Sequence, residues 1–156
     1  MLKTRTISDI ESGTVIDHIK PGCGLYIAQS LRLIHDATRM ILCLNLSSNT
    51  LGEKDLIKIS NIKLSDETLD KIAVFSPGAT VSWIEDYQVE RKQSVRMPER
   101  IDSFFSCPND NCISREEGET SSFKLQPYKK QHLIQCCYCA RSFDLETFKK
   151  RGAPCP

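Results

Sequence analysis

The stretch CPNDNC, residues 107–112, is followed further along the chain by CCYC, residues 136–139. Zinc in structural sites takes four tetrahedral ligands, and cysteine thiolates are common among them. The Pro-Asn-Asp sequence favours a tight turn that brings the first two sulfurs together. The first and last cysteines of the second stretch have the two-residue spacing of a metal-binding knuckle. We therefore predict one structural zinc ion per chain. The predicted ligands are Cys107, Cys112, Cys136 and Cys139.

Several alternatives remain open at the cysteines. Pairing Cys137 with Cys139 would leave a spacing that fits a knuckle poorly, and His132 could replace one thiolate. Two disulfides would use the same cysteines, and an iron ion would accept the same four sulfurs. Four thiolates complete a tetrahedron, so the predicted ion has no open position for substrate and is not catalytic. Cys23, Cys43 and Cys155 are too far apart to form a motif, and Cys43 is expected to be a core residue.

Composition and charge are those of a globular protein. The 156 residues carry a net charge of +1, with 40% hydrophobic and 26% charged residues. This balance predicts no general attraction to nucleic acid or to a membrane surface. The N-terminal sequence has no apolar core of a secretion signal, and no apolar run is long enough to span a bilayer. We expect a cytoplasmic protein, where reducing conditions favour metal thiolates over disulfides.

The chain changes character close to Pro98, which divides it into predicted segments 1–97 and 98–156. The first segment has periodic apolar stretches in the order β, α, β, β, α, β, which is typical of a ferredoxin-like sandwich. Two helices should cover one face of an antiparallel sheet. The expected elements are a strand at 14–19, a helix at 24–34, strands at 39–48 and 56–62, a helix at 66–75 after Ser65, and an extended run at 79–90.

The second segment is too small to bury a large core, so it needs a metal to hold it together. Its predicted strands lie at 101–107, 121–128 and 132–139, and a short helix is expected at 144–150. Together the segments predict an α+β protein: a ferredoxin-like βαββαβ sandwich followed by a small all-β zinc ribbon of the rubredoxin-like type.

Polar residues interrupt the first segment's strands. Asp17 and His18 lie mid-strand, and Val15, Asp17 and Ile19 are expected to share a face. Three lysines, at positions 54, 58 and 92, come from different elements. This set is compatible with a phosphorylated ligand, although each residue taken alone is more often a structural histidine or a solvated lysine. No glycine-rich phosphate loop is present.

Ordered motifs along the chain resemble one family. They are GTVIDHI (13–19), KDLIKI (54–59), MPERID (97–102), CPNDNCIS (107–114), SSF (121–123) and CYCARSF (137–143). From about residue 7 to residue 145, the chain resembles the regulatory chain of aspartate carbamoyltransferase. The resemblance implies a βαββαβ allosteric domain that binds nucleotides and a zinc domain that docks on a separate catalytic chain.

The resemblance also implies roles for individual residues at a nucleoside triphosphate site of the CTP or ATP type. Lys92 and His18 would meet the phosphates, and Asp17 and Lys58 the ribose and base. Lys54 would lie near the triphosphate or a second nucleotide. The remaining implied contacts are Ile10, Ser82, Ile84, Tyr87 and Val89.

The same resemblance implies the partners of the chain. Residues on the two cysteine knuckles would dock on the catalytic chain, and the N-terminal domains would pair into a homodimer. The expected function is non-catalytic allosteric control in pyrimidine biosynthesis. Two other functions stay open: a zinc-ribbon nucleic-acid-binding protein and a small-ligand enzyme on a ferredoxin-like fold. The implied docking residues are Asn109, Asn111, Tyr138 and Arg141.

Overall fold

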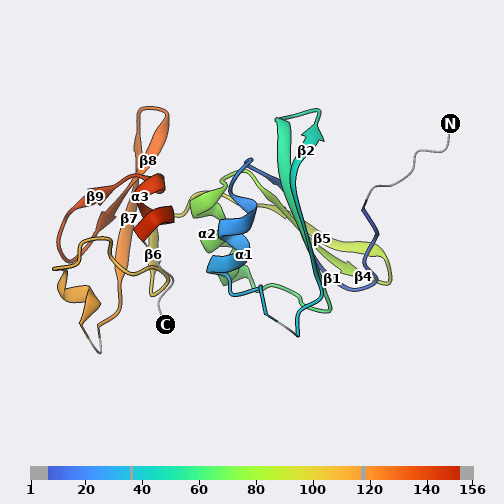
Figure 1. Ribbon diagram of the computed structural model, residues 1–156, viewed down its shortest axis with the longest axis horizontal. Coiled ribbons are helices and arrows are strands. Elements are labelled where there is room, and N and C mark those ends of the chain that lie inside the picture. Colours follow the sequence, from blue (N-terminus) through green and yellow to red (C-terminus); the bar gives the residue numbers. More distant parts are fainter. Residues whose placement is uncertain (1–6, 36, 117–118, 152–156) are drawn as a thin grey trace.

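The computed structural model describes residues 7–35, 37–116 and 119–151. Cys155 and the outer ends of both predicted segments lie outside the described residues. The fold is α+β, as predicted, with two antiparallel sheets of five and four strands (Figure 1). Among the described residues, no helix is long and apolar enough to cross a membrane.

The five-stranded sheet has the order β2-β3-β1-β4-β5. Its first four strands have the ferredoxin-like order, and two helices lie against one face, whereas no described helix lies against the other (Figure 1). The helical face of the sheet is apolar: Ile16, Ile57 and Val81 are fully buried. The elements are β1 Gly13–Ile19, α1 Gly24–Ser30, β2 Met40–Ser48, β3 Gly52–Ser60, α2 Asp66–Phe75, β4 Thr80–Glu85 and β5 Gln88–Ser94.

The predicted extended run at 79–90 is wrong in one respect, because it contains a hairpin. Asp86 and Tyr87 form a two-residue turn with φ of 49° and 62°. Such turns favour Asn-Gly or Asp-Gly, so Asp-Tyr gives a weak signal in the sequence. The N–H of Tyr87 donates to the carbonyl of Glu11 at 3.0 Å, which fixes the turn against the segment before β1.

A bulge in β1 corrects a second prediction. His18 has a φ of 54°, and the register between β1 and β3 shifts between Ile16 and Ile19. A bulge reverses the alternation of side chains. Ile19 is therefore fully buried on the helical face, whereas Asp17 stays half-buried on the opposite face with Val15.

Two further expectations for the first half differ from the structure. Helix α1 ends at Ser30 and Arg32 has a φ of 53°, so the helix is shorter than predicted. Its buried residues include Ile27 and Ala28, whereas Leu25 and Ile34 are exposed. Cys43 pairs with Leu56 and is half-buried rather than part of the core.

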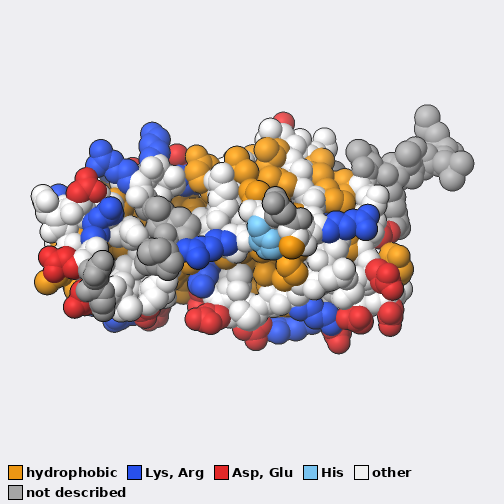
Figure 2. Space-filling model, turned by 60° about the horizontal axis from the view of Figure 1, so that its bottom comes forward, with side chains coloured by type: hydrophobic (Ala, Val, Ile, Leu, Met, Phe, Trp, Pro, Cys, Tyr) orange, Lys and Arg blue, Asp and Glu red, His pale blue; other side chains and the backbone are white. Residues whose placement is uncertain are grey.

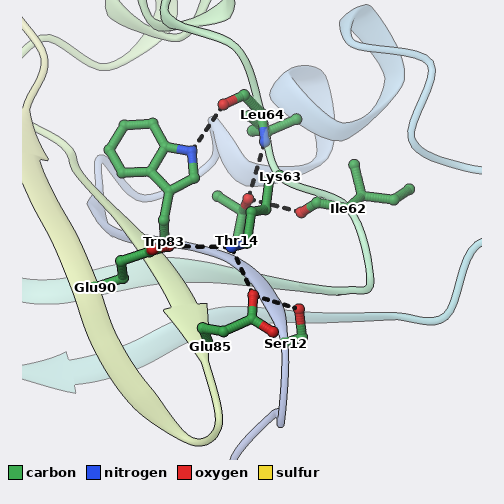
Figure 3. Close-up of polar contacts among 8 residues, drawn as sticks. All are labelled: Ser12, Thr14, Ile62, Lys63, Leu64, Trp83, Glu85 and Glu90. Carbon is green, nitrogen blue, oxygen red and sulfur yellow. Dashed lines mark hydrogen bonds and ion pairs between the residues drawn. The ribbon is translucent and has the colours of Figure 1, made fainter.

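Buried Thr14 fixes the loop between β3 and α2 (Figure 3). Its Oγ1 donates to the carbonyl of Ile62 at 2.7 Å and accepts the N–H of Leu64 at 3.1 Å. The indole of Trp83 donates to the carbonyl of Leu64 at 2.7 Å. One hydroxyl therefore satisfies two backbone groups that have left the β ladder.

Replacing Thr14 with valine should destabilise the first half by about 2–4 kcal/mol, since each unsatisfied buried polar group costs about 1–3 kcal/mol. Urea unfolding followed by Trp83 fluorescence measures this loss. Ser12→Ala is the matched control, because the Ser12 hydroxyl makes only an exposed 3.3 Å contact to Glu85 (Figure 3). Equal stability of the Thr14 variant and the unmodified chain would contradict the role of this hydroxyl.

The second half is a four-stranded sheet in the order β6-β7-β8-β9. The predicted strand at 101–107 is short, and residues after Asp102 leave the sheet. The predicted helix is present and begins at Leu145. The elements are β6 Arg100–Asp102, the 3-10 turn Ile113–Arg115, β7 Ser122–Tyr128, β8 Gln131–Cys136, β9 Ser142–Phe143 and α3 Leu145–Arg151.

Aromatic side chains join the two halves into one core. The ring of Phe105 lies 5.5 Å from that of Phe75 at the end of α2 and 5.3 Å from that of Phe148 in α3. Phe148 also packs edge-on against Phe123 of β7, at 5.1 Å between centroids. Helix α3 lies between the second sheet and the helices of the first half (Figure 1).

Candidate binding face and metal centre

Four cysteine sulfurs converge between the two knuckles of the second half. The Sγ atoms of Cys107 and Cys139 are 3.8 Å apart, and those of Cys112 and Cys136 are 3.7 Å apart. All four ligand atoms lie within 4.8 Å of one another. A disulfide needs a sulfur separation of about 2.05 Å, whereas tetrahedral ligands about 2.3 Å from a zinc ion lie roughly 3.8 Å apart. The donor set therefore fits a tetrahedral metal ion.

The pKa values of the cysteine thiols are consistent with a metal-binding site. Burial raises the pKa of Cys107 and of Cys136. Burial acts in the same direction at Cys139, but the backbone N–H of Arg141 and the side chain of Asn109 outweigh it and lower the pKa to about 7. Because ligand sulfurs must be deprotonated, a cation has to displace protons from these thiols, and metal loading should weaken as pH falls.

The predicted docking residues lie around this cluster. The side-chain oxygen of Asn109 accepts hydrogen bonds from Arg141 Nη1 at 3.2 Å and from the N–H of Asn111 at 3.3 Å. Tyr138 and Arg141 are exposed on the second knuckle. The structure thus brings Asn109, Asn111 and Arg141 together, with Tyr138 next to a metal ligand.

The uncovered face of the first sheet holds most of the other predicted residues. Strand register aligns one residue from each strand across all five strands. Directly opposite residues in antiparallel strands share a face, and Ile16 and Ile57 beside this row are buried on the helical side. We call this set the open-face row. Its members are Ile41, Lys58, Val15, Ser82 and Lys92.

Beside the open-face row lies a charged group from β1 and β3. Lys54 Nζ is 2.7 Å from Asp17 Oδ1, and the N–H of His18 donates to the same oxygen at 2.6 Å. Burial alone would raise the pKa of Asp17, but the hydrogen bonds from Lys54 and His18 outweigh it and lower the pKa. Asp17 is therefore ionised at neutral pH. The buried Nδ1 atom of His18 has no hydrogen-bond partner among the described residues.

On the other side of the row, the segment before β1 folds over Lys58. Lys58 Nζ donates to the carbonyl of Ser8 at 2.8 Å and lies 3.6 Å from Asp9. A cavity of about 240 Å³ here is lined by Ile10, Tyr87, Ile41 and Arg39, among others. Arg39 and Ile41 were not predicted as site residues. The alternation of Ile41 with Leu42, which packs against the core, is a signal that could have placed Ile41.

The remaining predicted residues lie on the same sheet but not in this cavity. Ile84 is opposite Gly13 and Val89, and Val89 is exposed. His18 lines a separate hollow of about 670 Å³ with Thr50, Thr80 and other residues. The structure therefore brings Ile10 and Tyr87 together at the cavity, places Lys58 against Ser8 and Asp9, and places His18 beyond Asp17 along β1.

A ferredoxin-like sheet joined to a four-thiolate ribbon defines an α+β metal-binding protein. Comparison with known families identifies both parts. Residues 5–96 match the family model of the aspartate carbamoyltransferase regulatory chain, allosteric domain, and residues 99–149 match that of the metal binding domain. The chain belongs to the family of aspartate carbamoyltransferase regulatory chains.

Individual relatives agree with this assignment. The aspartate carbamoyltransferase regulatory chain of Sodalis glossinidius is 44% identical over 138 residues, which is 88% of this chain and 90% of that protein. That of Vibrio parahaemolyticus is 39% identical over 145 residues, or 93% and 95% of the two chains. The relatives are named as regulatory chains, which confirms the predicted family and its non-catalytic role.

Proposed function

We propose that the chain is the zinc-containing regulatory subunit that controls aspartate carbamoyltransferase in response to nucleoside triphosphates, and thereby pyrimidine biosynthesis. In this proposal residues 1–97 bind the effector and pair with a second regulatory chain. Residues 98–156 dock on the catalytic chain. The assembly works in the cytoplasm, where the four thiolates stay reduced.

The observation that carries the nucleotide proposal is the open-face row. Lys58 and Lys92 lie at either side of Val15 and Ser82, which leaves an apolar and a hydroxyl group between two cations. Lysine provides charge for phosphate oxygens. The hydroxyl of Ser82 can donate a hydrogen bond to a sugar or accept one from it, and the ionised carboxylate of Asp17 can accept one. The Asp17–Lys54 pair extends the polar surface along β1 and β3.

The face also supports discrimination between bases. Ile10, Tyr87 and Ile41 border the cavity, which the segment of residues 8–12 also lines. Backbone N–H and carbonyl groups at fixed positions can distinguish the edge of a cytosine from that of an adenine, because the two edges present donors and acceptors in different orders. We assign base recognition to this segment.

The nucleic-acid alternative gains no support from the face drawn in Figure 2. On the face drawn in Figure 2, lysine and arginine side chains are interspersed with acidic ones over both halves, without a broad basic patch. A nucleic-acid-binding surface ordinarily concentrates positive charge on one face. Control of a partner needs only that the effector bind one quaternary state more tightly than the other.

Replacing Lys92 with alanine should weaken triphosphate binding about tenfold to hundredfold, because a hydrogen bond to a charged group contributes roughly 1.5–3 kcal/mol. Binding of the corresponding nucleoside should change little. Calorimetric titration of both ligands measures the difference. The matched control is Arg91→Ala, since Arg91 neighbours Lys92 but stacks over Trp83 on the helical side, 4.4 Å from the ring centroid. Equal losses for nucleoside and triphosphate would contradict a phosphate role for Lys92.

Substitutions in the two halves should impair different functions. Asp17→Ala should leave assembly with the catalytic chain intact but abolish the response to nucleotide. Arg141→Glu should weaken assembly, because it reverses a charge next to the metal knuckles and removes the contact to Asn109. Sedimentation with the catalytic chain and calorimetry with nucleotide separate these effects. If Arg141→Glu lost nucleotide binding and kept assembly, the division of roles would be wrong.

A further inference from the structure

A cavity of about 380 Å³ lies where the two halves meet. Its apolar walls come from both: Val74 and Phe75 end α2, Met97 lies in the connection, and Leu125 and Ile134 belong to the second sheet. Pockets for small molecules have volumes of about 300–1,000 Å³ and are frequent at domain interfaces. None of the residues proposed to bind nucleotide lines this cavity, although Lys20 and Pro77 also line the hollow that contains His18.

The rim of the cavity carries two lysines, two acids and a histidine. Lys20 from the first half and Lys130 from the second are exposed, and neither side chain makes an ion pair or hydrogen bond with another described residue. Among the described residues, the rim keeps two unpaired lysines against the single negative charge of Asp144, because Glu146 is paired with a lysine. Asp144 accepts the N–H of Thr147 at 2.8 Å, and Glu146 pairs with Lys149 at 3.0 Å.

We propose that this cavity binds a small organic acid with an apolar body. The apolar body would pack against the Val74, Phe75 and Ile134 walls, and its carboxylate would lie between Lys20 and Lys130. Burial of an apolar surface favours binding, and the two free cations select an anion over a neutral analogue. Such a ligand contacts both halves, so it favours whichever arrangement of the halves keeps the cavity closed.

Octanoate is a suitable probe because it joins an eight-carbon chain to one carboxylate. Calorimetric titration of the full chain, below the micelle concentration, should show one octanoate bound per chain. Octanol should bind at least about tenfold more weakly, since it lacks the charge that the lysines recognise. In the same assay, the double variant Lys20→Ala, Lys130→Ala should lose about tenfold or more in octanoate affinity and little in octanol affinity.

Two controls locate the binding. Lys129→Ala should bind octanoate normally, because Lys129 stacks on Tyr128 at 5.4 Å and does not line the cavity. Among methyl-labelled methionines, Met97 should shift on binding, whereas Met40, which packs against the core of the first half, should not. Absence of binding, equal affinities for octanoate and octanol, an unaffected lysine double variant or an unmoved Met97 signal would each overturn the proposal. None of these results bears on nucleotide binding at the open face.

Discussion

Replacing Cys112 with serine should remove the metal and unfold the second half. Cys112 is 3% exposed, and its sulfur lies 3.7 Å from that of Cys136. Structural zinc contributes about 10–16 kcal/mol of apparent binding free energy in small modules, which exceeds the stability of a core of this size. The expected result is loss of bound metal, loss of the second sheet and no assembly with the catalytic chain.

Metal analysis and circular dichroism of the purified chain measure these losses. The matched control is Cys137→Ser, because Cys137 is adjacent to Cys136 but exposed and outside the four-sulfur cluster. That variant should retain one zinc per chain and its fold. A Cys112 variant that kept full metal content, or a reduced and soluble chain without any metal, would contradict the proposed ligand set.

Replacing Gly13 with alanine should destabilise the first sheet by about 4 kcal/mol, at the upper end of single substitutions. Gly13 has a φ of +137°, and an added Cβ would lie 2.0 Å from the carbonyl oxygen of Ile59. A backbone atom in a paired strand cannot move aside as a flexible side chain can. The β1–β3 pairing must therefore shift, and that shift also disturbs the row that contains Lys58.

Gly52→Ala separates steric overlap from backbone strain. Gly52 also has a positive φ, +78°, but an added Cβ there meets no atom within 4 Å. Its replacement should cost only the left-handed strain of about 1–2 kcal/mol. Urea unfolding of both variants, followed by Trp83 fluorescence, gives the comparison. If the two glycine variants lost equal stability, close approach of Ile59 would not be the reason for glycine at position 13.

The metal centre and the order of the first four strands could be predicted because each depends on local spacing. The short spacing within each knuckle brings its two sulfurs together independently of the rest of the fold. Apolar periodicity distinguishes strands from helices. The bulge at His18 and the turn at Asp86–Tyr87 could not be predicted in the same way. Both place a residue other than glycine at positive φ, and tertiary contacts rather than local preference hold it there.

The contact between the two halves could not be predicted from the sequence. Phe104 and Phe105 lie in a stretch that was predicted to be a strand, and alternation would send them to opposite faces. Both are buried, with ring centroids 4.3 Å apart, because the chain leaves the sheet after Asp102. Which partner an aromatic ring contacts depends on where α2 and α3 end, and no pattern within residues 101–107 contains that information.

Because the two halves share an aromatic core, we expect the folding of the whole subunit to depend on metal binding. If the second half unfolds without its ion, Phe75 at the end of α2 loses its contact with Phe105, and Phe105 loses its contact with Phe148. Exposed aromatic surface and unpaired strands are what chaperones and proteases in a cell recognise. Chains that fail to acquire the ion are thus selected for removal, and the population available to the catalytic partner is enriched in complete subunits.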